Sequence, residues 1–245
     1  MNSTLDGRTA LVTGASSGIG RATALALSKA GARVAVGARR ADRLTSLAQE
    51  APGELLVLEL DVTDRQSVQD AVAAAVDRFG ALDALVNNAG VMLNGPILNA
   101  DTAEWRRMVD TNLLGSMYTA HAALPHLLES RGAVVQISST SGRTASAGGG
   151  VYAATKFGVT AFAESLRQEV TAQGVRVIVV EPGMVATELL THITDPALRD
   201  YAKTYAESMR TLNAEDIADA VLYALTQPDH VAVNEILIRP TDQTR

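Results

Sequence analysis

The stretch TALVTGASSGIG, residues 9–20, decides the fold of this chain of 245 residues. Its first part, Thr9–Thr13, is a short run of β-branched and apolar residues, which is typical of a strand buried on both faces. Glycines follow at positions 14, 18 and 20, and a segment with helical periodicity then runs over Ile19–Ala30. A strand, a glycine-rich turn and a helix in this order predict the first βα unit of a parallel sheet.

The same alternation continues along the whole chain. Six more β-rich runs are separated by helical segments, and these runs are Arg33–Ala38, Leu55–Leu60, Ala84–Val86, Ala133–Ile137, Val175–Val180 and Glu235–Ile238. The later segments with helical periodicity are Ser67–Phe79, Ala103–Glu129, Tyr152–Gln173 and Glu215–Leu225. We therefore predict a single α/β domain over residues 1–245, with a Rossmann-type, doubly wound parallel sheet of seven strands and helices on both faces.

Residues 184–210 interrupt this alternation with a stretch of mixed polarity between the sixth predicted strand and the last predicted helix. Ligands of open α/β sheets bind outside the carboxyl ends of the strands. We therefore expect residues 184–210 to form an inserted substrate loop at that end of the sheet. Three consecutive glycines, 148–150, leave room or flexibility near the same region, although a plain loop is the simpler interpretation. Gly31 and Gly80 stand where two helices should end.

The composition excludes several classes of function. Hydrophobic residues make up 47% of the chain and charged residues 20%, which is the balance of an ordinary globular protein. The net charge of −6 argues against nucleic-acid binding, and the lack of cysteine excludes disulfides, thiolate catalysis and zinc–sulfur sites. Met1 to Arg8 contain no apolar stretch of signal-peptide length, and no run of about 18 apolar residues follows. We expect a cytoplasmic protein without a membrane span or a metal site.

The glycine-rich turn indicates a site for the pyrophosphate of a dinucleotide. Glycines let the backbone approach the phosphates closely, and the following helix offers unpaired N–H groups and the positive end of its dipole. The spacing here is G-x-x-x-G-x-G, which differs from the usual G-x-G-x-x-G. A glycine turn without a ligand is the alternative interpretation.

The end of the second predicted strand indicates which dinucleotide binds. An NAD site usually has an acidic residue about 20 positions after the glycine-rich turn, whereas an arginine accommodates the 2′-phosphate of NADP. Here the strand ends Gly37-Ala38-Arg39-Arg40, without an acid. Both arginines precede a helix predicted to start near Ala41, where cations oppose the helix dipole and a phosphate would offset that cost. We predict NADP(H), with Arg39 as the main phosphate contact and Arg40 beside it; two solvated surface arginines are the alternative.

Three residues, Tyr152, Lys156 and Ser139, together indicate proton exchange with a carbonyl or an alcohol. Tyr152 and Lys156 lie four positions apart, so on a helix they point to the same face. A free phenol has a pKa near ~10, and a nearby cation lowers that pKa, which would let Tyr152 exchange a proton with a carbonyl or an alcohol. Ser139, thirteen positions before Tyr152, could hydrogen-bond the same oxygen. Tyr-x-x-x-Lys alone is a weak signal, because ordinary helix surfaces also carry it.

Further motifs follow one another at suitable separations, and they are Asp61-Val62, Asn87-Asn88-Ala89-Gly90, Asn112, Ser139, Tyr152, Lys156 and Pro182-Gly183. Together with the glycine-rich turn, this ordered set resembles the compact short-chain dehydrogenases/reductases over essentially the whole chain. The resemblance implies an NADP(H)-dependent enzyme that reversibly reduces an aldehyde or a ketone of a small molecule. The distant alternative is a non-catalytic protein that binds NADP(H) to sense redox state, and such a protein would not need the whole set.

The resemblance also implies a role for each residue. Tyr152 would be the general acid and base, and Lys156 would bind the nicotinamide ribose and lower the pKa of the tyrosine. Ser139 would orient the substrate carbonyl, and Asn112 would hold a water that joins Lys156 to solvent. Ser138 competes with Ser139, and Asn112 could simply interrupt a helix. The cofactor-binding residues would be Gly14, Ser16, Ser17, Gly18, Ile19, Gly20, Arg39, Arg40, Asp61, Val62, Asn88, Ala89, Gly90, Tyr152, Lys156, Pro182, Gly183, Val185 and Thr187.

Only weaker similarities indicate the substrate. The C-terminal stretch, residues 233–243, lacks the glycine-rich last strand of ketoacyl-carrier-protein reductases. It is similar instead to clavulanate-aldehyde reductases and to NADP-dependent 3-hydroxy-acid and serine dehydrogenases. These similarities imply a carboxylate-bearing small molecule or a secondary-metabolite aldehyde, with oxidation of serine or a 3-hydroxy acid as the alternative. Some basic residues could meet a carboxylate, although solvated surface charges are the simpler interpretation: Arg143, His192, Arg199 and Lys203.

The partners implied by the resemblance are copies of the same chain. The family commonly forms tetramers through the helices predicted over Ala103–Glu129 and Tyr152–Gln173. Small residues such as Ala161 and Ala163 would permit close helix contact, although a buried face within one chain would need them as well. We therefore expect a homotetramer or a homodimer.

Overall fold

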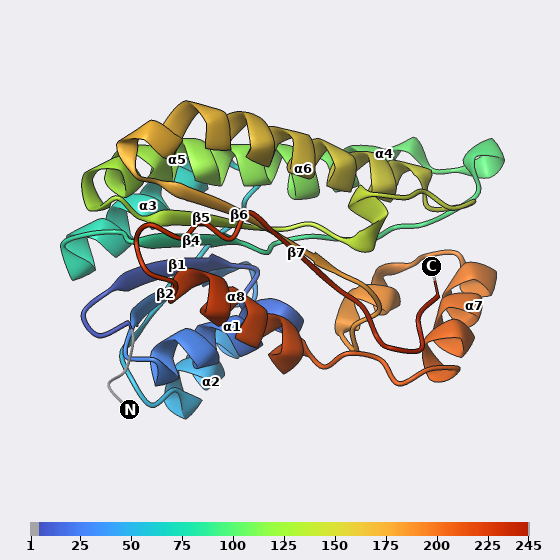
Figure 1. Ribbon diagram of the computed structural model, residues 1–245. Helices are drawn as coiled ribbons and strands as arrows, with labels where there is room; N and C mark the ends of the chain where they lie inside the picture. Colours follow the sequence, from blue (N-terminus) through green and yellow to red (C-terminus); the bar gives the residue numbers. More distant parts are fainter. Residues whose placement is uncertain (1–4, 245) are drawn as a thin grey trace.

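Seven parallel strands form the centre of the molecule (Figure 1). The computed structural model describes residues 5–244, and its sheet has the strand order β3-β2-β1-β4-β5-β6-β7. The strands are β1 (Thr9–Thr13), β2 (Arg33–Ala38), β3 (Leu55–Glu59), β4 (Ala84–Asn87), β5 (Ala133–Ile137), β6 (Arg176–Pro182) and β7 (Glu235–Ile238). The predicted parallel sheet of seven strands is therefore confirmed. Residues 1–4 and 245 of the predicted domain lie outside the described residues.

Helices cover both faces of this sheet, as predicted (Figure 1). One face carries α1 (Gly18–Lys29), α2 (Ala41–Glu50) and α8 (Ala214–Leu225), and the other carries α3 (Arg65–Phe79), α5 (Gly115–Ser130) and α6 (Gly150–Val170). No helix within residues 5–244 is both long enough and apolar enough to cross a membrane.

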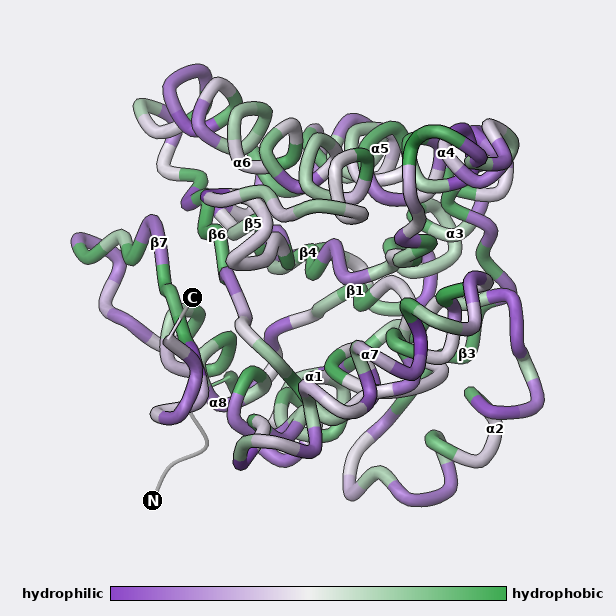
Figure 2. Tube along the Cα trace, turned by 90° about the vertical axis from the view of Figure 1, so that its right-hand side faces the viewer, coloured by the Kyte–Doolittle hydropathy of each residue, from purple (hydrophilic) through white to green (hydrophobic). Residues whose placement is uncertain are grey.

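The sheet is buried on both faces because successive residues of a strand point to opposite sides. In β1, Val12 belongs to the apolar cluster under α1 and α8, whereas Leu11 belongs to the cluster under α3, α5 and α6. Both side chains are fully buried. Figure 2 shows the complementary pattern, with hydrophilic residues concentrated in the outer turns such as those around α2. The continuous apolar runs of the sequence therefore predicted the layers correctly.

The strand order reverses at β1, which pairs with β2 on one side and with β4 on the other. Such a switch point opens a crevice at the carboxyl ends of the two strands, where ligands of this architecture bind. Gly80 ends α3 with a φ of 83°, and Gly31 follows α1 with a φ of 93°. Both glycines therefore end helices, as the sequence predicted.

The prediction of one continuous helix over Ala103–Glu129 is wrong. Helix α4 (Thr102–Met108) passes into a π-helical turn, Val109–Leu114, before α5 begins. A π-turn widens the helix by one residue and is frequent at functional sites. Asn112, inside this turn, is buried and bonds both backbone groups of Val91, at 2.8 and 2.9 Å. These two bonds stabilise the irregular turn, and no local sequence signal announces them.

The segment 184–210 contains more regular structure than the expected loop. It holds a 3-10 turn, Glu188–His192, and helix α7 (Pro196–Glu207), which lies on the same side of the molecule as α4 (Figure 1). Asp195 caps α7 by accepting a hydrogen bond from the Leu198 N–H at 2.9 Å, and Pro196 occupies the first turn. Aspartate followed by proline is a helix-start signal that the polarity pattern alone did not reveal.

Candidate active site

The glycine-rich turn between β1 and α1 is built to receive an anion. Gly14 and Gly18 have φ angles of 66° and 54°, in the left-handed region that favours glycine. A Cβ atom on Gly14 would come within 2.7 Å of Ala89, so the two strands leave no room for a side chain. Ser17, at the N-cap of α1, makes no side-chain capping bond, and the first turn has no acidic residue. The positive end of α1 is therefore free to bind phosphate.

Asn88 and Thr13 hold this turn against β4. The Asn88 amide donates to the carbonyls of Thr13 and Gly14, at 3.0 and 3.2 Å. The Thr13 hydroxyl accepts from the backbone N–H groups of Asn88 and Ala89, at 3.0 and 3.1 Å. These four bonds fix the shape of the turn, so Asn88 and Ala89 support the phosphate site from behind.

Asp61 and Val62 lie where β3 ends, on the side of the crevice expected for adenosine. One oxygen of Asp61 accepts from the N–H and the hydroxyl of Thr63, at 3.0 and 2.8 Å. Val62 is buried, and its side chain packs directly against the backbone of Gly115. Asp61 is therefore held in a fixed orientation and retains a second carboxylate oxygen that could accept from an amino group.

Two arginines bind one carboxylate beside the glycine-rich turn between β1 and α1, which is called the phosphate turn below. Arg40 donates to the hydroxyls of Ser16 and Ser17, at 2.9 and 3.0 Å, and to Glu188 at 3.1 Å. Arg43 donates to both oxygens of Glu188, at 2.8 and 2.9 Å. These bonds, first those from Arg43, hold the pKa of Glu188 below its usual range. The two guanidinium groups already surround an anionic group, which is the arrangement that a phosphate needs.

Arg39 differs from its neighbours because it is exposed and makes no hydrogen bond or ion pair in the described part of the chain. Its guanidinium is therefore free of other side-chain partners, and its contact with a 2′-phosphate stays a prediction. Arg43 was missed by the sequence interpretation. It stands three positions after Arg40, in the first turn of α2, so the spacing of neighbouring residues on one helix face is the signal that could have found it.

Tyr152 lies in the first turn of α6 and is buried in an apolar cluster with Val91, Leu93 and Met108. Burial raises the pKa of Tyr152 to about 12, and a hydrogen bond with Ser139 opposes that rise. The expectation that Lys156 lowers the pKa of Tyr152 is wrong for this structure. The Lys156 ammonium lies 5.7 Å from the centre of the Tyr152 ring, and the desolvation of the phenolate outweighs any attraction. At neutral pH the phenol is protonated and able to donate.

The side chains of Lys156 and Asn112 both lie close to Gly90. The Lys156 ammonium donates to the carbonyl of Ile137 at 2.7 Å, and burial lowers the pKa of this lysine to about 8. A Cβ atom on Gly90 would lie 3.4 Å from the Asn112 Oδ1 atom and 3.9 Å from the Lys156 Nζ atom. The absence of a side chain at Gly90 therefore keeps a small space open between the amide and the ammonium.

Replacing Lys156 with methionine is expected to change how the free energy of unfolding depends on pH. In the folded chain the pKa of Lys156 is lowered from 10.5 to about 8, whereas the unfolded chain keeps the ordinary value. Between these values the unfolded state binds more protons, so the lysine makes the stability of the wild type rise with pH. This contribution is roughly 3 kcal/mol. Urea denaturation at about pH 7 and about pH 10 measures it, and equal pH dependence in the two proteins would contradict it.

The surroundings of Ser138 and Ser139 indicate which of the two serines could meet the substrate oxygen. Ser138 is buried, and its hydroxyl bonds the carbonyl of Lys156 at 3.2 Å and the hydroxyl of Thr160 at 3.0 Å. The hydroxyl of Ser139, two positions after the end of β5, instead reaches Tyr152. The geometry therefore favours Ser139 as the serine that meets a substrate oxygen beside the phenol.

The end of β6 closes the crevice from the other side. Pro182 is the last residue of β6, and its carbonyl accepts from the Ser139 hydroxyl at 3.5 Å. Thr187 packs over the phosphate turn, since a Cβ atom on Gly18 would come within 3.1 Å of its methyl group. This segment therefore runs from the reacting groups to the phosphate turn, which is the path expected for the residues Pro182, Gly183, Val185 and Thr187.

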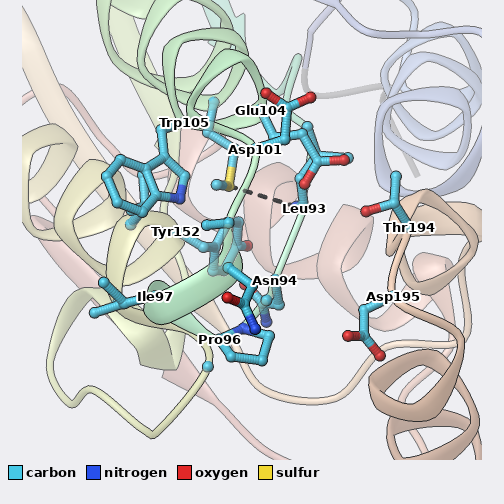
Figure 3. Close-up of a pocket in the computed structure, with 17 residues that line it drawn as sticks. Leu93, Asn94, Pro96, Ile97, Asp101, Glu104, Trp105, Tyr152, Thr194 and Asp195 are labelled. Atoms are coloured by element: carbon cyan, nitrogen blue, oxygen red, sulfur yellow. Dashed lines mark hydrogen bonds between the residues drawn. The ribbon is translucent and has the colours of Figure 1, made fainter.

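A cavity of about 280 Å³ opens beside Tyr152 (Figure 3). Ile97 and Trp105 lie on one side of it, and Thr194 and Asp195 lie on the opposite side. The wall therefore combines the segment after β4, the start of α4 and the residues just before α7. The glycines at 148 and 150 also line it, as their position before Tyr152 suggested. Trp105 was not predicted, although it is the single tryptophan of the chain.

The basic residues considered for a carboxylate do not line this cavity. Arg143 pairs with the fully buried carboxylate of Glu181 at 2.6 Å and also with Glu235. Lys203 pairs with Glu207 along α7, at 3.8 Å. None of these four residues lines the wall beside Tyr152: Arg143, His192, Arg199 and Lys203. The Arg199 guanidinium nevertheless donates to the carbonyl of Ile193 at 3.5 Å, one position before Thr194 of that wall.

These groups fit a dinucleotide that carries a 2′-phosphate. An uncapped helix start and a glycine-rich turn suit the pyrophosphate, and Arg40 and Arg43, which meet at Glu188, suit a further phosphate together with the neighbouring Arg39. A buried phenol, a serine and a lysine stand together at the other end of the crevice. Such a fold and site define a nucleotide-dependent oxidoreductase that acts on carbonyl and alcohol groups.

Comparison with known proteins agrees with this class. A family model described as short chain dehydrogenase matches residues 8–197. The chain therefore belongs to the short-chain dehydrogenase family, and it is an NADP-dependent oxidoreductase of that family.

Curated relatives cover most of the chain. The glycine betaine reductase ATRR of Emericella nidulans is 46% identical over 244 residues, which are 98% of this chain but only 19% of that protein. An oxidoreductase of Staphylococcus aureus is 41% identical over 238 residues, which cover 96% of this chain and 98% of the relative. The first relative is thus a much longer protein, whereas the second has nearly the same extent.

Solved structures show the same fold with NADP bound. The closed form of a serine dehydrogenase complexed with NADP+ superposes with a TM-score of 0.91 at 34% identity, covering 97% of this chain and 96% of that one. An alcohol dehydrogenase from Thermococcus sibiricus, complexed with 5-hydroxy-NADP, gives a TM-score of 0.85 at 30% identity, covering 97% and 98%. NADP(H) is therefore the cofactor, as the missing acid after β2 predicted.

Proposed function

We propose that this enzyme reduces a small aldehyde or ketone to an alcohol with NADPH. The observation that carries the proposal is the buried phenol of Tyr152, hydrogen-bonded to Ser139 on the wall of the cavity. Because its pKa lies at about 12, this phenol holds its proton at neutral pH. A protonated group beside a carbonyl favours reduction over oxidation, since oxidation needs a base at the same place.

Each residue of the site would have a separate role in the reduction of the carbonyl group. Bound NADPH supplies the hydride for the carbonyl carbon. Tyr152 donates a proton to the carbonyl oxygen, and Ser139 hydrogen-bonds the same oxygen while negative charge develops on it. Lys156, with its lowered pKa of about 8, gives up a proton readily. Its ammonium lies 5.7 Å from the centre of the Tyr152 ring and, like the Asn112 amide, close to Gly90. The apolar cluster around Tyr152 excludes water from the phenol.

A screen of carbonyl compounds tests this proposal. The purified protein is expected to oxidise NADPH in the presence of some small aldehydes or ketones and to leave NADPH unchanged without them. The protein whose Tyr152 is replaced by phenylalanine serves as the control for contaminating reductases. If NADPH binds but no aldehyde or ketone of any charge is turned over, a protein that only senses redox state becomes the better interpretation.

Oxidation of serine or of another 3-hydroxy acid is the second candidate, because serine dehydrogenase structures are among the similar ones. Such substrates carry a carboxylate, and the cavity wall offers no lysine, arginine or histidine to bind it. The longer relative is named for glycine betaine, which carries a quaternary ammonium group as well as a carboxylate. Serine, a 3-hydroxy acid and NADP+ should be included in the screen, and their rapid turnover would favour this candidate.

Self-association and location stay predictions. The outer face of α6 exposes Ala154, Phe157 and Ala161, one above another, which suits close packing against a second copy. Ala163, which the sequence interpretation named with Ala161, instead faces the core. We propose a homotetramer or homodimer in the cytoplasm, and the mass in solution tests the assembly.

A further inference from the structure

The wall of the cavity beside Tyr152 carries three carboxylates and no cation. Asp101, Glu104 and Asp195 line it, and none of the other lining residues is lysine, arginine or histidine. Figure 3 shows Asp101 and Glu104 above the cavity and Asp195 on the side of α7. The acids therefore come from two segments that are far apart in the sequence and meet only around this space.

Helix capping explains only part of this arrangement. Asp101 and Asp195 accept from the N–H groups of Ala103 and Leu198, each through one oxygen at 2.9 Å. A cap requires a side-chain oxygen and not a charge, since serine and asparagine cap as well as aspartate. Within residues 5–244, no ion pair neutralises either aspartate or Glu104. Three carboxylates without an ion-pair partner thus line one small cavity.

Trp105 provides a second, independent feature of the same wall. The indole is half-buried and faces the space across from Asp195 (Figure 3). No lysine or arginine lies over this ring in the described part of the chain. Tryptophan binds cations best among the aromatic residues, and it recognises quaternary ammonium groups in particular. Carboxylates combined with an indole face suit the binding of an organic cation.

A metal ion does not fit this wall. Within the described residues, no three carboxylate or histidine side chains stand close enough together to hold a metal. Asp101 and Glu104 lie together on one side of the cavity and Asp195 lies on another (Figure 3), and apolar side chains of Leu93, Ile97 and Met108 complete the wall. Such a lining suits methyl or methylene groups attached to a charged nitrogen better than a bare ion.

We propose that the substrate is a small aldehyde or ketone carrying a positively charged nitrogen, bound by Asp101, Glu104, Asp195 and Trp105 while Tyr152 meets its carbonyl. This inference rests on the proposed carbonyl reduction and names its substrate class. The cavity of about 280 Å³ lies just below the range of roughly 300–1,000 Å³ typical of drug-sized ligands, so the substrate is small. The three carboxylates would attract a cationic substrate and repel an anionic one. Both effects would make the enzyme select cationic over anionic substrates.

Three aldehydes that differ mainly in charge test the proposal. Trimethylammonioacetaldehyde is the cation, 3,3-dimethylbutanal is its neutral isostere with carbon in place of nitrogen, and 4-oxobutanoate is an anion. With NADPH in excess, kcat/KM for the cation is expected to exceed that for the isostere by about tenfold or more, and that for the anion by more. Equal or better turnover of the neutral or anionic aldehyde would overturn the proposal.

Variants that remove the negative charge of one acid but keep the shape of its side chain test the role of each carboxylate. Glu104→Gln, Asp101→Asn and Asp195→Asn keep the side-chain oxygens, so the two helix caps persist. Each is expected to reduce kcat/KM for the cation about three- to tenfold, mainly through KM, and to leave the isostere within about twofold. Comparing each variant with the wild type on the same pair cancels differences in aldehyde hydration. Asp200→Asn, on α7 but outside the cavity wall, is the matched control and should change neither substrate.

Trp105 allows a measurement that does not depend on turnover. Because the chain has one tryptophan, its fluorescence reports on this wall alone. With NADP+ present and ionic strength held constant, choline is expected to change the emission saturably, and 3,3-dimethylbutan-1-ol is expected to do so at least about tenfold more weakly. Choline binding without reduction of any aldehyde would overturn the proposed function, and with it the substrate class, while still showing that this wall binds an organic cation. Reduction of aldehydes without any charge preference would overturn this inference and leave the proposed function standing.

Discussion

Replacing Tyr152 with phenylalanine is expected to lower kcat by about a thousandfold, because the variant keeps the ring but loses the proton donor. The phenol is the acid at the carbonyl end of the cavity, and its pKa of about 12 keeps it protonated at working pH. The ring of the introduced phenylalanine would still pack against Val91, Leu93 and Met108, so the fold should survive. Initial rates with the aldehyde that the screen identifies measure the loss.

The loss of rate shows a catalytic role for Tyr152 only if the variant still binds NADPH and folds as stably as the wild type. The affinity for NADPH should change by less than about threefold, and the free energy of unfolding by about 1 kcal/mol or less, since one hydrogen bond to Ser139 is lost. Tyr118→Phe, in α5 and away from the cavity wall, makes the same chemical change as a control. Retention of more than about a tenth of the wild-type rate in the Tyr152 variant would remove Tyr152 from its proposed role.

Regular spacing explains why these reacting groups could be predicted from the sequence. Tyr152 and Lys156 share a face of α6 because positions four apart always do so on a helix, and Ser139 follows a strand whose apolar run is unmistakable. The phosphate turn could also be predicted from the sequence, since glycines between a strand and a helix are typical of a phosphate-binding turn. In both cases the chemistry depends on local geometry that the sequence encodes directly.

Burial and long-range contact explain what the sequence could not show. The pKa of Tyr152 is raised rather than lowered because the surrounding core, and not the neighbouring lysine, dominates its environment. The partner that Arg43 and Arg40 share, Glu188, lies 145 and 148 positions away from them. The acidic cavity wall likewise unites residues from α4 and from the start of α7, and no window of the sequence contains both. The turn around Asn112 has ordinary helical propensity, so only its bonds to Val91 reveal it.

Arg39→Asp is expected to weaken the use of NADPH about a hundredfold or more while changing the use of NADH less than about threefold. A hydrogen bond between charged groups contributes about 1.5–3 kcal/mol, and the new carboxylate would also repel the 2′-phosphate. Of these three arginines, Arg39 has no hydrogen-bond or ion-pair partner in the described residues, whereas Arg40 and Arg43 are bonded to Glu188. The ratio of kcat/KM for the two cofactors measures the change. Arg78→Asp, at the far end of α3, is the matched charge reversal and should leave the ratio unaltered.

Glu188→Gln is expected to have the opposite effect on NADPH binding. The Glu188 carboxylate occupies the two guanidinium groups that stand nearest to Arg39 in sequence, so it competes with a phosphate for them. Removing its charge should strengthen NADPH binding about two- to fivefold and leave NADH binding unchanged, because only NADPH brings a 2′-phosphate to this place. Titration of both cofactors into the variant measures the effect. Equal shifts for NADPH and NADH, or weaker NADPH binding, would show that Glu188 positions the arginines and does not compete with the phosphate.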